Sequence, residues 1–194
     1  MKKNELRELL YEWKSFINEE KKEDFFLNKL YEKIKTLGNE SKITFSKDNV
    51  MIHGENIEGL PLQGKIVFKE LYDNNNNRVK IKDKEGITRE GFAVDTTVDT
   101  TSGYGPLLYD LLIEYVSEKS GFLAPDPNGV SNDAYQVWDI YKNERKDVKR
   151  IEFSDFNIKN LDLDYDYDEV LEIFKAFYKE KMEITNLANK NIEY

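Results

Sequence analysis

The stretch Thr100-Thr101-Ser102-Gly103-Tyr104-Gly105-Pro106 indicates how this chain of 194 residues folds. Before it, apolar residues alternate from Phe92 to Val98 as they do in a strand, which we expect to be central. After it, apolar residues recur at helical spacing from Leu107 to Val116. Pro106 fits the first turn of a helix, where its missing N–H group has no partner to lose. The stretch therefore predicts a strand, a glycine turn and a helix in direct succession.

The glycine turn, Ser102–Pro106, has the composition of an anion site. Gly103 and Gly105 let backbone N–H groups point outward without a Cβ in the way. Together with the positive end of the helix dipole, these donors suit a phosphate group. No Gly-Lys-Ser/Thr follows, which excludes the P-loop of nucleotide hydrolases, and a third glycine is missing, which disfavours a dinucleotide fold. By the motif alone, a purely structural turn is the alternative.

The segments on either side predict a single α/β domain with a short hairpin near its start. The four asparagines Asn74–Asn77 separate two alternating segments and predict a hairpin loop, because asparagine tolerates positive φ. Gly38 is the expected C-cap of the helix before it, and Ser131 the N-cap of a later one. The other elements expected are helices over 5–19 and 24–37, strands over 43–45, 50–52, 122–124 and 148–153, and a last helix from 170 that includes Phe177 and Tyr178, followed by a polar end over 183–194.

Composition narrows the possible functions. The chain has no cysteine, which excludes disulfides, thiolate zinc sites and cysteine nucleophiles, and His53 alone leaves too few ligands for a transition metal. A net charge of −9 disfavours nucleic acid as a partner. No signal peptide is visible, and the longest apolar runs are far shorter than the ~20 residues that span a membrane. We expect a cytoplasmic protein without a metal or a membrane partner.

The stretch Gly103-Tyr104-Gly105-Pro106-Leu107-Leu108-Tyr109-Asp110 resembles the acetyl-CoA loop of GNAT-like proteins encoded by bacteriophages, within the GNAT superfamily of N-acetyltransferases. The similarity covers about a third of the chain, from Phe92 to Val148, and it continues through Pro125-Asp126, Val130-Ser131, Ala134, Val137-Trp138, Tyr141, Arg145 and Asp147-Val148. It implies a mixed, mostly antiparallel central sheet flanked by helices. The expected parts are a helical N-terminal extension (1–38), an acyl-CoA-binding core (42–153) and a C-terminal helical extension (154–194).

The resemblance implies acetyl-CoA as the cofactor. The backbone N–H groups of Gly103, Tyr104 and Gly105 would bind its pyrophosphate, and the strand end at Val98 would hold the pantetheine arm. Thr100 stands where the family motif, Gln/Arg-x-x-Gly-x-Gly/Ala, has Gln or Arg, which removes one side-chain contact to the pyrophosphate. The cofactor-binding residues expected are Val98, Thr100, Thr101, Ser102, Gly103, Tyr104, Gly105, Pro106 and Leu107.

The resemblance also implies transfer of an acetyl group to an amine, and an acidic protein favours a cationic acceptor: a protein lysine, an N-terminus or a small amine. Asp95 and Asp99 are the candidate bases, with solvated carboxylates as the alternative reading. The tyrosine that serves as the acid in many family members is replaced here by Trp138, whose N–H group has no usable pKa. Tyr141 is our first candidate for the acid and Tyr135 the second.

The remaining carboxylates have simpler interpretations. Asp110 and Glu114, in the helix after the glycine turn, are expected to offset the helix dipole or to form a polar face. The alternating aspartates over 162–168 lack the glycine and glutamate of a calcium loop, so we expect a charged edge strand or a capping run. The alternative function is a catalytically silent phage GNAT-like module that binds a host or virion protein, with the N-terminal helices as its docking surface.

Overall fold

The structure is a computed structural model that describes residues 25–73, 75–98, 100–126, 130–151 and 176–193. A helix covers residues 25–35. The elements that follow are β1 (Lys42–Phe45), β2 (Asn49–Glu55), β3 (Pro61–Glu70), β4 (Lys80–Lys82), β5 (Thr88–Val98), α2 (Gly105–Glu118), β6 (Gly121–Ala124), α3 (Asn132–Asn143), β7 (Val148–Ile151), β8 (Ala176–Lys179), α5 (Glu183–Leu187), η3 (Asn189–Asn191) and β9 (Ile192–Glu193).

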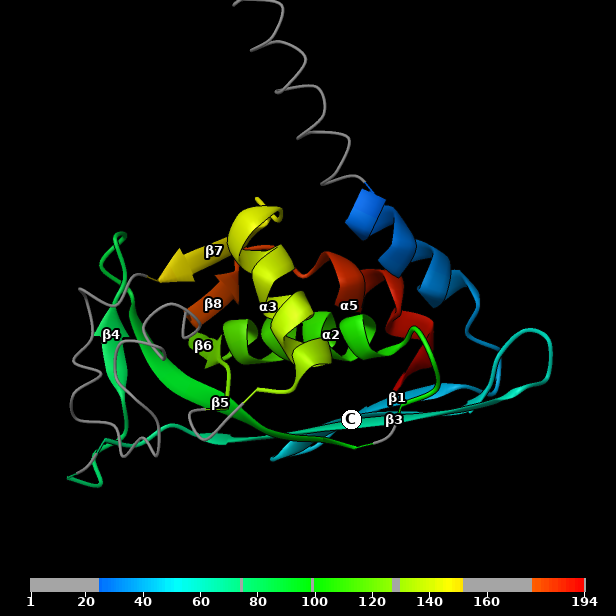
Figure 1. The fold of residues 1–194 in the computed structure, drawn as a ribbon, viewed down its shortest axis with the longest axis horizontal. Helices are drawn as coiled ribbons and strands as arrows, with labels where there is room; N and C mark the ends of the chain where they lie inside the picture. The colour runs from blue at the N-terminus through cyan, green and yellow to red at the C-terminus, as the bar shows by residue number, and fades with distance from the viewer. Residues whose placement is uncertain (1–24, 74, 99, 127–129, 152–175, 194) are drawn as a thin grey trace, which may run out of the picture.

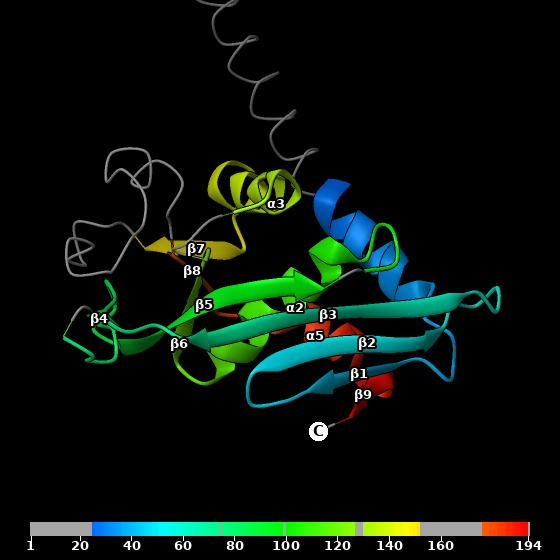
Figure 2. The same ribbon diagram turned by 60° about the horizontal axis from the view of Figure 1, so that its bottom comes forward.

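The strands form one sheet in the order β7-β8-β6-β5-β3-β2-β1-β9, and β4 pairs with β5 beside this path. Among the described strand pairs, β5–β6 and β1–β9 are parallel and the others are antiparallel. The helices lie over one face of this sheet (Figure 1). Figure 2 shows the sheet from the opposite side, with the strands in front. The expectation of an α/β fold with a mixed, mostly antiparallel sheet flanked by helices is confirmed.

The core lies between α2 and the sheet. Alternate residues of β3, from Leu62 to Phe68, are buried, as are Val50 and Ile52 of β2, because successive side chains of a strand point to opposite faces. The leucines of α2, including Leu107 and Leu111, are buried in the same cluster. Strand periodicity therefore predicted the β1–β2 hairpin correctly, with Ile43 opposite Ile52.

The capping and turn residues account for three local features. Ser131 caps α3 by accepting a hydrogen bond from the N–H group of Ala134 at 3.3 Å, as its position in the sequence predicts. The asparagine loop is a hairpin turn in which Asn76 has a φ of 61°. Gly38 is not a left-handed helix cap. A Cβ at Gly38 would lie 2.4 Å from the carbonyl oxygen of Glu55, so it permits a close approach of two backbone segments.

The C-terminal region differs from the expectation in two places. Phe177 and Tyr178 belong to strand β8, not to a helix, and β8 is buried on both faces between β6 and β7. A short apolar run buried on both faces lacks the alternation that distinguishes a strand from a helix. The polar end is also ordered, because Ile184 and Ala188 are fully buried and β9 extends the sheet beside β1. The helix expected over 5–19, the start of the last helix and the aspartates over 162–168 lie outside the described residues.

No helix in the described ranges combines the length and the apolar character needed to cross a bilayer.

Candidate functional site

The glycine turn joins β5 to α2 in the geometry that the sequence predicts. Gly103 has a φ of +82°, a left-handed conformation that favours glycine. Pro106 lies in the first turn of α2, where no side chain of the described residues caps the helix and no acidic residue offsets its dipole. N–H groups at the start of a helix have no partner within the helix, so the turn presents hydrogen-bond donors at the positive end of the dipole.

The turn and the two threonines before it are held against β3 and against the end of helix 25–35. The Thr101 N–H group donates to the carbonyl oxygen of Gln63 at 2.8 Å, and the Gln63 N–H group donates to Thr101 Oγ1 at 3.0 Å. The Tyr104 hydroxyl, 2.7 Å from Thr36 Oγ1, connects the turn to the end of helix 25–35. Thr100 packs against β3, where a Cβ at Gly64 would lie 2.9 Å from its methyl group. These threonine and tyrosine side chains position the turn. The Tyr104 N–H group, expected to bind the pyrophosphate, instead donates to the carbonyl oxygen of Thr101 at 3.1 Å, which leaves the two glycines as the donors of the turn.

Strand β5 separates from β6 just before the turn. The parallel pairing of β5 with β6 spans Glu90 to Ala93, whereas β5 continues to Val98 along β3. The β3–β5 register shifts at Phe68, which pairs with Val94, and Asp95 is the extra residue of this bulge. Bulges bend a strand and increase its twist. After Ala93, the edge of β5 that faces away from β3 is therefore no longer paired with β6.

The candidate base Asp95 forms an ion pair at the surface. Its Oδ1 lies 2.5 Å from Lys69 Nζ, and both side chains are about two-fifths exposed, at 40% and 43%. Lys69 pairs with Ala93 in the sheet, so the bulge brings the carboxylate of Asp95 beside it. Asp99 lies outside the described residues. The structure thus places one candidate base, in contact with a lysine and not with either candidate acid.

The two candidate acids lie in different environments on α3. The Tyr141 hydroxyl is buried and donates a hydrogen bond to Asp110 Oδ2 at 2.9 Å. Burial, and then the negative charge of Asp110, raise the pKa of Tyr141 well above its usual value of 10.0. Tyr135 is exposed. Trp138, which the resemblance aligns with a catalytic tyrosine, is a core residue that stacks on Phe177 with ring centroids 5.5 Å apart.

Asp110 belongs to a buried cluster of charged side chains that the sequence did not predict. Arg145 binds Asp110 through two hydrogen bonds, at 2.8 and 3.1 Å, and also binds Asp147 at 2.7 and 2.8 Å. Lys179 Nζ lies 2.6 Å from Glu114, 3.1 Å from Asp147 and 3.6 Å from Asp110. Three carboxylates and two cations give this charged cluster a formal charge of −1.

The expectation for Asp110 and Glu114 is therefore wrong. They do not form a solvated polar face, because α2 is covered on several sides and both residues are 1% exposed or less. They also do not offset the helix dipole, because neither lies in the first turn of α2. Glu114 also accepts the N–H groups of Ile184 at 3.0 Å and Thr185 at 2.6 Å, which holds α5 against α2. The available signal was two acids four residues apart within the mostly apolar stretch 107–116. Their partners, at Arg145 and beyond, are too far along the chain to be found from sequence.

The charges of the cluster favour the ionised forms of Asp147 and Lys179. Burial alone would raise the pKa of Asp147, but hydrogen bonds and charge from Arg145, and then the charge of Lys179, lower it. Burial alone would lower the pKa of Lys179, but the charges of Asp110, Glu114 and Asp147 raise it. The cluster thus ties α2 and β8 to the loop between α3 and β7 with charge-assisted hydrogen bonds.

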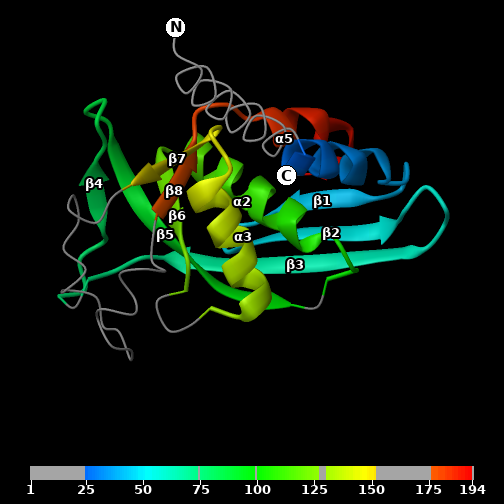
Figure 3. The ribbon, with the colours of Figure 1, turned by 45° about the horizontal axis from the view of Figure 1, so that its top comes forward.

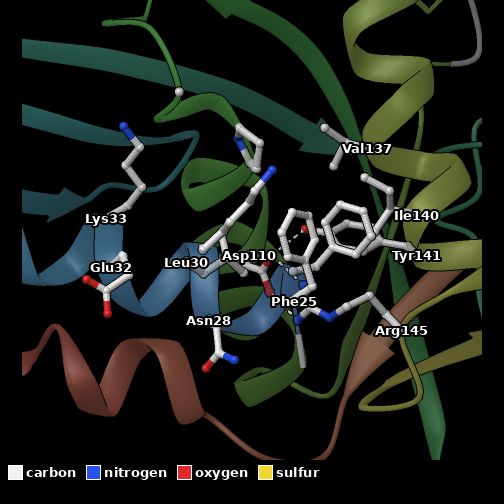
Figure 4. Close-up of a pocket in the computed structure, with 14 residues that line it drawn as sticks. Phe25, Asn28, Leu30, Glu32, Lys33, Asp110, Val137, Ile140, Tyr141 and Arg145 are labelled. Atoms are coloured by element: carbon white, nitrogen blue, oxygen red, sulfur yellow. Dashed lines mark hydrogen bonds and ion pairs between the residues drawn. The ribbon is translucent and has the colours of Figure 1, made fainter. Parts of the chain in front are cut away.

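A pocket of about 610 Å³ opens between helix 25–35, the start of α2, and α3. Figure 4 shows Val137, Ile140 and Tyr141 of α3 on one side and Lys33 on the other, with Asp110 beneath. Gly103 and Pro106 of the glycine turn line the pocket as well. Figure 3 shows the helices that surround it from above. The pocket thus adjoins the turn on the side away from the sheet.

Sequence reasoning missed the lysines of helix 25–35. A Cβ at Gly103 would lie 2.8 Å from Lys33 Nζ, and the same nitrogen lies 4.6 Å from the centre of the Tyr104 ring. Lys29, one helical turn earlier, lies 4.2 Å from the centre of the Phe25 ring. About seventy residues separate Lys33 from the turn, so only the fold brings its charge there.

Comparisons of the chain with family models, with curated proteins and with solved structures found no match.

Proposed function

We propose that this chain binds acetyl-CoA at the glycine turn and transfers the acetyl group to an amine. The observation that carries the proposal is the end of β5, which leaves β6 after Ala93, is bulged at Asp95 and leads into left-handed Gly103 and an uncapped helix. The free edge of β5 suits the amide groups of a pantetheine arm. The N–H groups of the turn suit a pyrophosphate.

The residues around the turn fit the charge of the cofactor. Lys33 Nζ lies beside Gly103, so it adds a positive charge to the donors of the turn. Gly105 leaves a free approach, because a Cβ there would meet only Thr100 Oγ1, at 3.8 Å. Thr100 packs on β3, so its side chain would not reach the pyrophosphate. The turn would instead bind the pyrophosphate through its backbone, and Lys33 would supply the contact that Gln or Arg supplies in the GNAT motif.

In the proposed reaction, the nitrogen of a neutral amine attacks the thioester carbonyl carbon, the C–S bond breaks and an amide forms. The proton lost by the amine passes to a base, and the CoA thiolate takes up a proton as it leaves. Asp95 or Asp99 would be the base, and Tyr141 or Tyr135 the acid. Tyr141 would have to break its hydrogen bond to Asp110 in order to act.

A second candidate function is supported by the same contacts. Tyr141 is bound to Asp110, Asp95 to Lys69, and Trp138 is packed in the core. If these groups keep their partners, the protein would transfer no acetyl group, whether or not it binds acetyl-CoA. We therefore propose, as the alternative, a catalytically silent module that binds a host or virion protein.

The test is isothermal titration of the wild type and three glycine variants with acetyl-CoA. Gly105→Val and Gly103→Ala should each weaken binding by about tenfold or more, because a Cβ hinders approach of the pyrophosphate to the backbone. Gly103→Ala should also destabilise the fold by about 1–2 kcal/mol, the penalty of a left-handed residue. Gly86→Ala is the matched control, because Gly86 has a φ of +84° and also lies beside a lysine.

Gly86→Ala should lower stability as Gly103→Ala does and leave acetyl-CoA affinity unchanged. A wild type that does not bind acetyl-CoA, or variants that all bind it equally, would contradict the proposal. Release of free CoA thiol is then followed with a panel of lysine peptides and small amines. Binding without transfer to any amine would favour the silent module.

A further inference from the structure

The pocket beside the glycine turn has the walls of a site for a flat, apolar ring. Its lining includes Phe25, Phe26, Val137 and Ile140, and a cavity of about 610 Å³ lies within the range of small-molecule sites. The Phe25 and Phe26 rings meet edge to face with centroids 5.5 Å apart, and Phe25 is 52% exposed. Exposed aromatic rings next to a pocket offer a stacking surface to a heterocycle.

The rim of this pocket is cationic in a protein whose net charge is −9. Within the described part of the chain, Lys29 and Lys33 form no ion pair with a carboxylate, and each lies over an aromatic ring. Glu32 also lines the pocket, and its carboxylate is paired with Lys35 of the same helix at 2.7 Å. The carboxylate at the base of the pocket, Asp110, is neutralised by Arg145. The charge that a ligand would meet at this rim is therefore positive.

The pocket and the turn are one continuous surface, since Gly103 and Pro106 line both. In CoA the pyrophosphate is joined through a single ribose to an adenine ring, and that ribose carries a 3′-phosphate. An adenosine attached to a pyrophosphate at the turn is therefore within reach of this pocket. Asn28 also lines the pocket, and an asparagine amide can pair with the N6 and N7 atoms of adenine.

We propose that this pocket binds the 3′-phosphoadenosine end of CoA, an inference that rests on the proposed function. The adenine packs between Phe25 and the apolar side of α3. Lys29 binds the 3′-phosphate, and Lys33 binds the pyrophosphate together with the turn. Helix 25–35, which lies outside the part of the chain that resembles GNAT proteins, thereby becomes part of the cofactor site and selects the phosphorylated form of the cofactor.

The test compares acetyl-CoA with acetyl-dephospho-CoA, which lacks only the 3′-phosphate. The wild type should bind acetyl-CoA about tenfold more tightly, the worth of one charge-assisted contact. Lys29→Met, which keeps the apolar stem, should remove that difference by weakening acetyl-CoA alone. Lys33→Met should weaken both ligands by about tenfold. Lys119→Met is the control and should change neither affinity, because Lys119 also lies over an aromatic ring, 3.8 Å from the centre of Tyr115, and does not line the pocket.

Two outcomes would overturn these assignments, and they differ. If the wild type binds both ligands equally and Lys29→Met changes neither affinity, the pocket assignment is wrong and the proposed cofactor stands. If the wild type binds neither ligand, the proposed function itself fails, and the inference with it. Circular dichroism and the urea midpoint of each lysine variant verify that a loss of affinity is not a loss of fold.

Discussion

Replacing Lys179 with methionine should destabilise the fold by about 3–5 kcal/mol, the cost of removing one partner from a buried ion pair. The Lys179 side chain is fully buried, and its Nζ contacts Glu114, Asp147 and Asp110 within 3.6 Å. Methionine fills a similar volume but leaves three carboxylates facing Arg145 alone. The formal charge of the charged cluster then changes from −1 to −2 in a region with little water to solvate it.

The expected size follows from what each carboxylate retains. Asp110 and Asp147 keep Arg145, but Glu114 keeps only the N–H groups of Ile184 and Thr185. Glu114→Gln in the Lys179→Met background removes one negative charge and should recover part of the loss. Such coupling between contacting residues is measured by a double-mutant cycle.

Urea unfolding followed by tryptophan fluorescence measures the effect, because Trp138 is 3% exposed and stacks on Phe177 of the same strand as Lys179. A Trp13→Phe background leaves Trp138 as the only tryptophan. Lys149→Met on neighbouring β7 is the control, since Lys149 is 47% exposed and lies 3.6 Å from Glu180. It should change stability by no more than about 0.5 kcal/mol.

A Lys179→Met variant that unfolds at the same urea concentration as Lys149→Met would refute this reasoning. It would mean that the carboxylates are solvated or protonated without the lysine. If Lys179→Met does not fold, Glu114→Gln alone provides the test. It weakens the same ion pair while the lysine keeps Asp110 and Asp147, and it should lower stability by about 1–3 kcal/mol.

Three further predictions concern the charged cluster and Tyr141, which is bonded to it through Asp110. The lowered pKa of Asp147 contributes stability above its unfolded value of about 3.9, which is lost as pH falls through the lower folded value. The raised pKa of Lys179 contributes stability below pH about 10.4, and this stability is lost as the pH rises through the higher folded pKa. The urea midpoint of the wild type should therefore fall at both acid and alkaline pH. Lys179→Met has no lysine to titrate, so its urea midpoint should fall less at alkaline pH. Tyr141→Phe should destabilise by about 1–3 kcal/mol by leaving Asp110 one donor short, whereas exposed Tyr135→Phe should change little. Turnover lowered about 10²–10⁴-fold in Tyr141→Phe would identify the acid, and unchanged turnover would exclude it.

The sequence by itself determined the local elements near the site. A left-handed glycine, a proline in a first helical turn and a serine N-cap act within a few residues, so Gly103, Pro106 and Ser131 indicated the strand, turn and helices correctly. The alternation in β1 to β3 likewise indicated which side chains face the core. These features need no knowledge of distant segments. The cofactor, its acceptor and the candidate acids and bases stay predictions.

The tertiary structure alone decided what depends on distant partners. Phe177 belongs to a strand because β6 and β7 flank it, and a run buried on both faces has no period that reveals this. Asp110 is buried because Arg145, 35 residues away, compensates its charge. Lys33 reaches Gly103 only because helix 25–35 packs beside α2. Burial and pairing of charges depend on which surfaces meet in space, and no local pattern of residues records that.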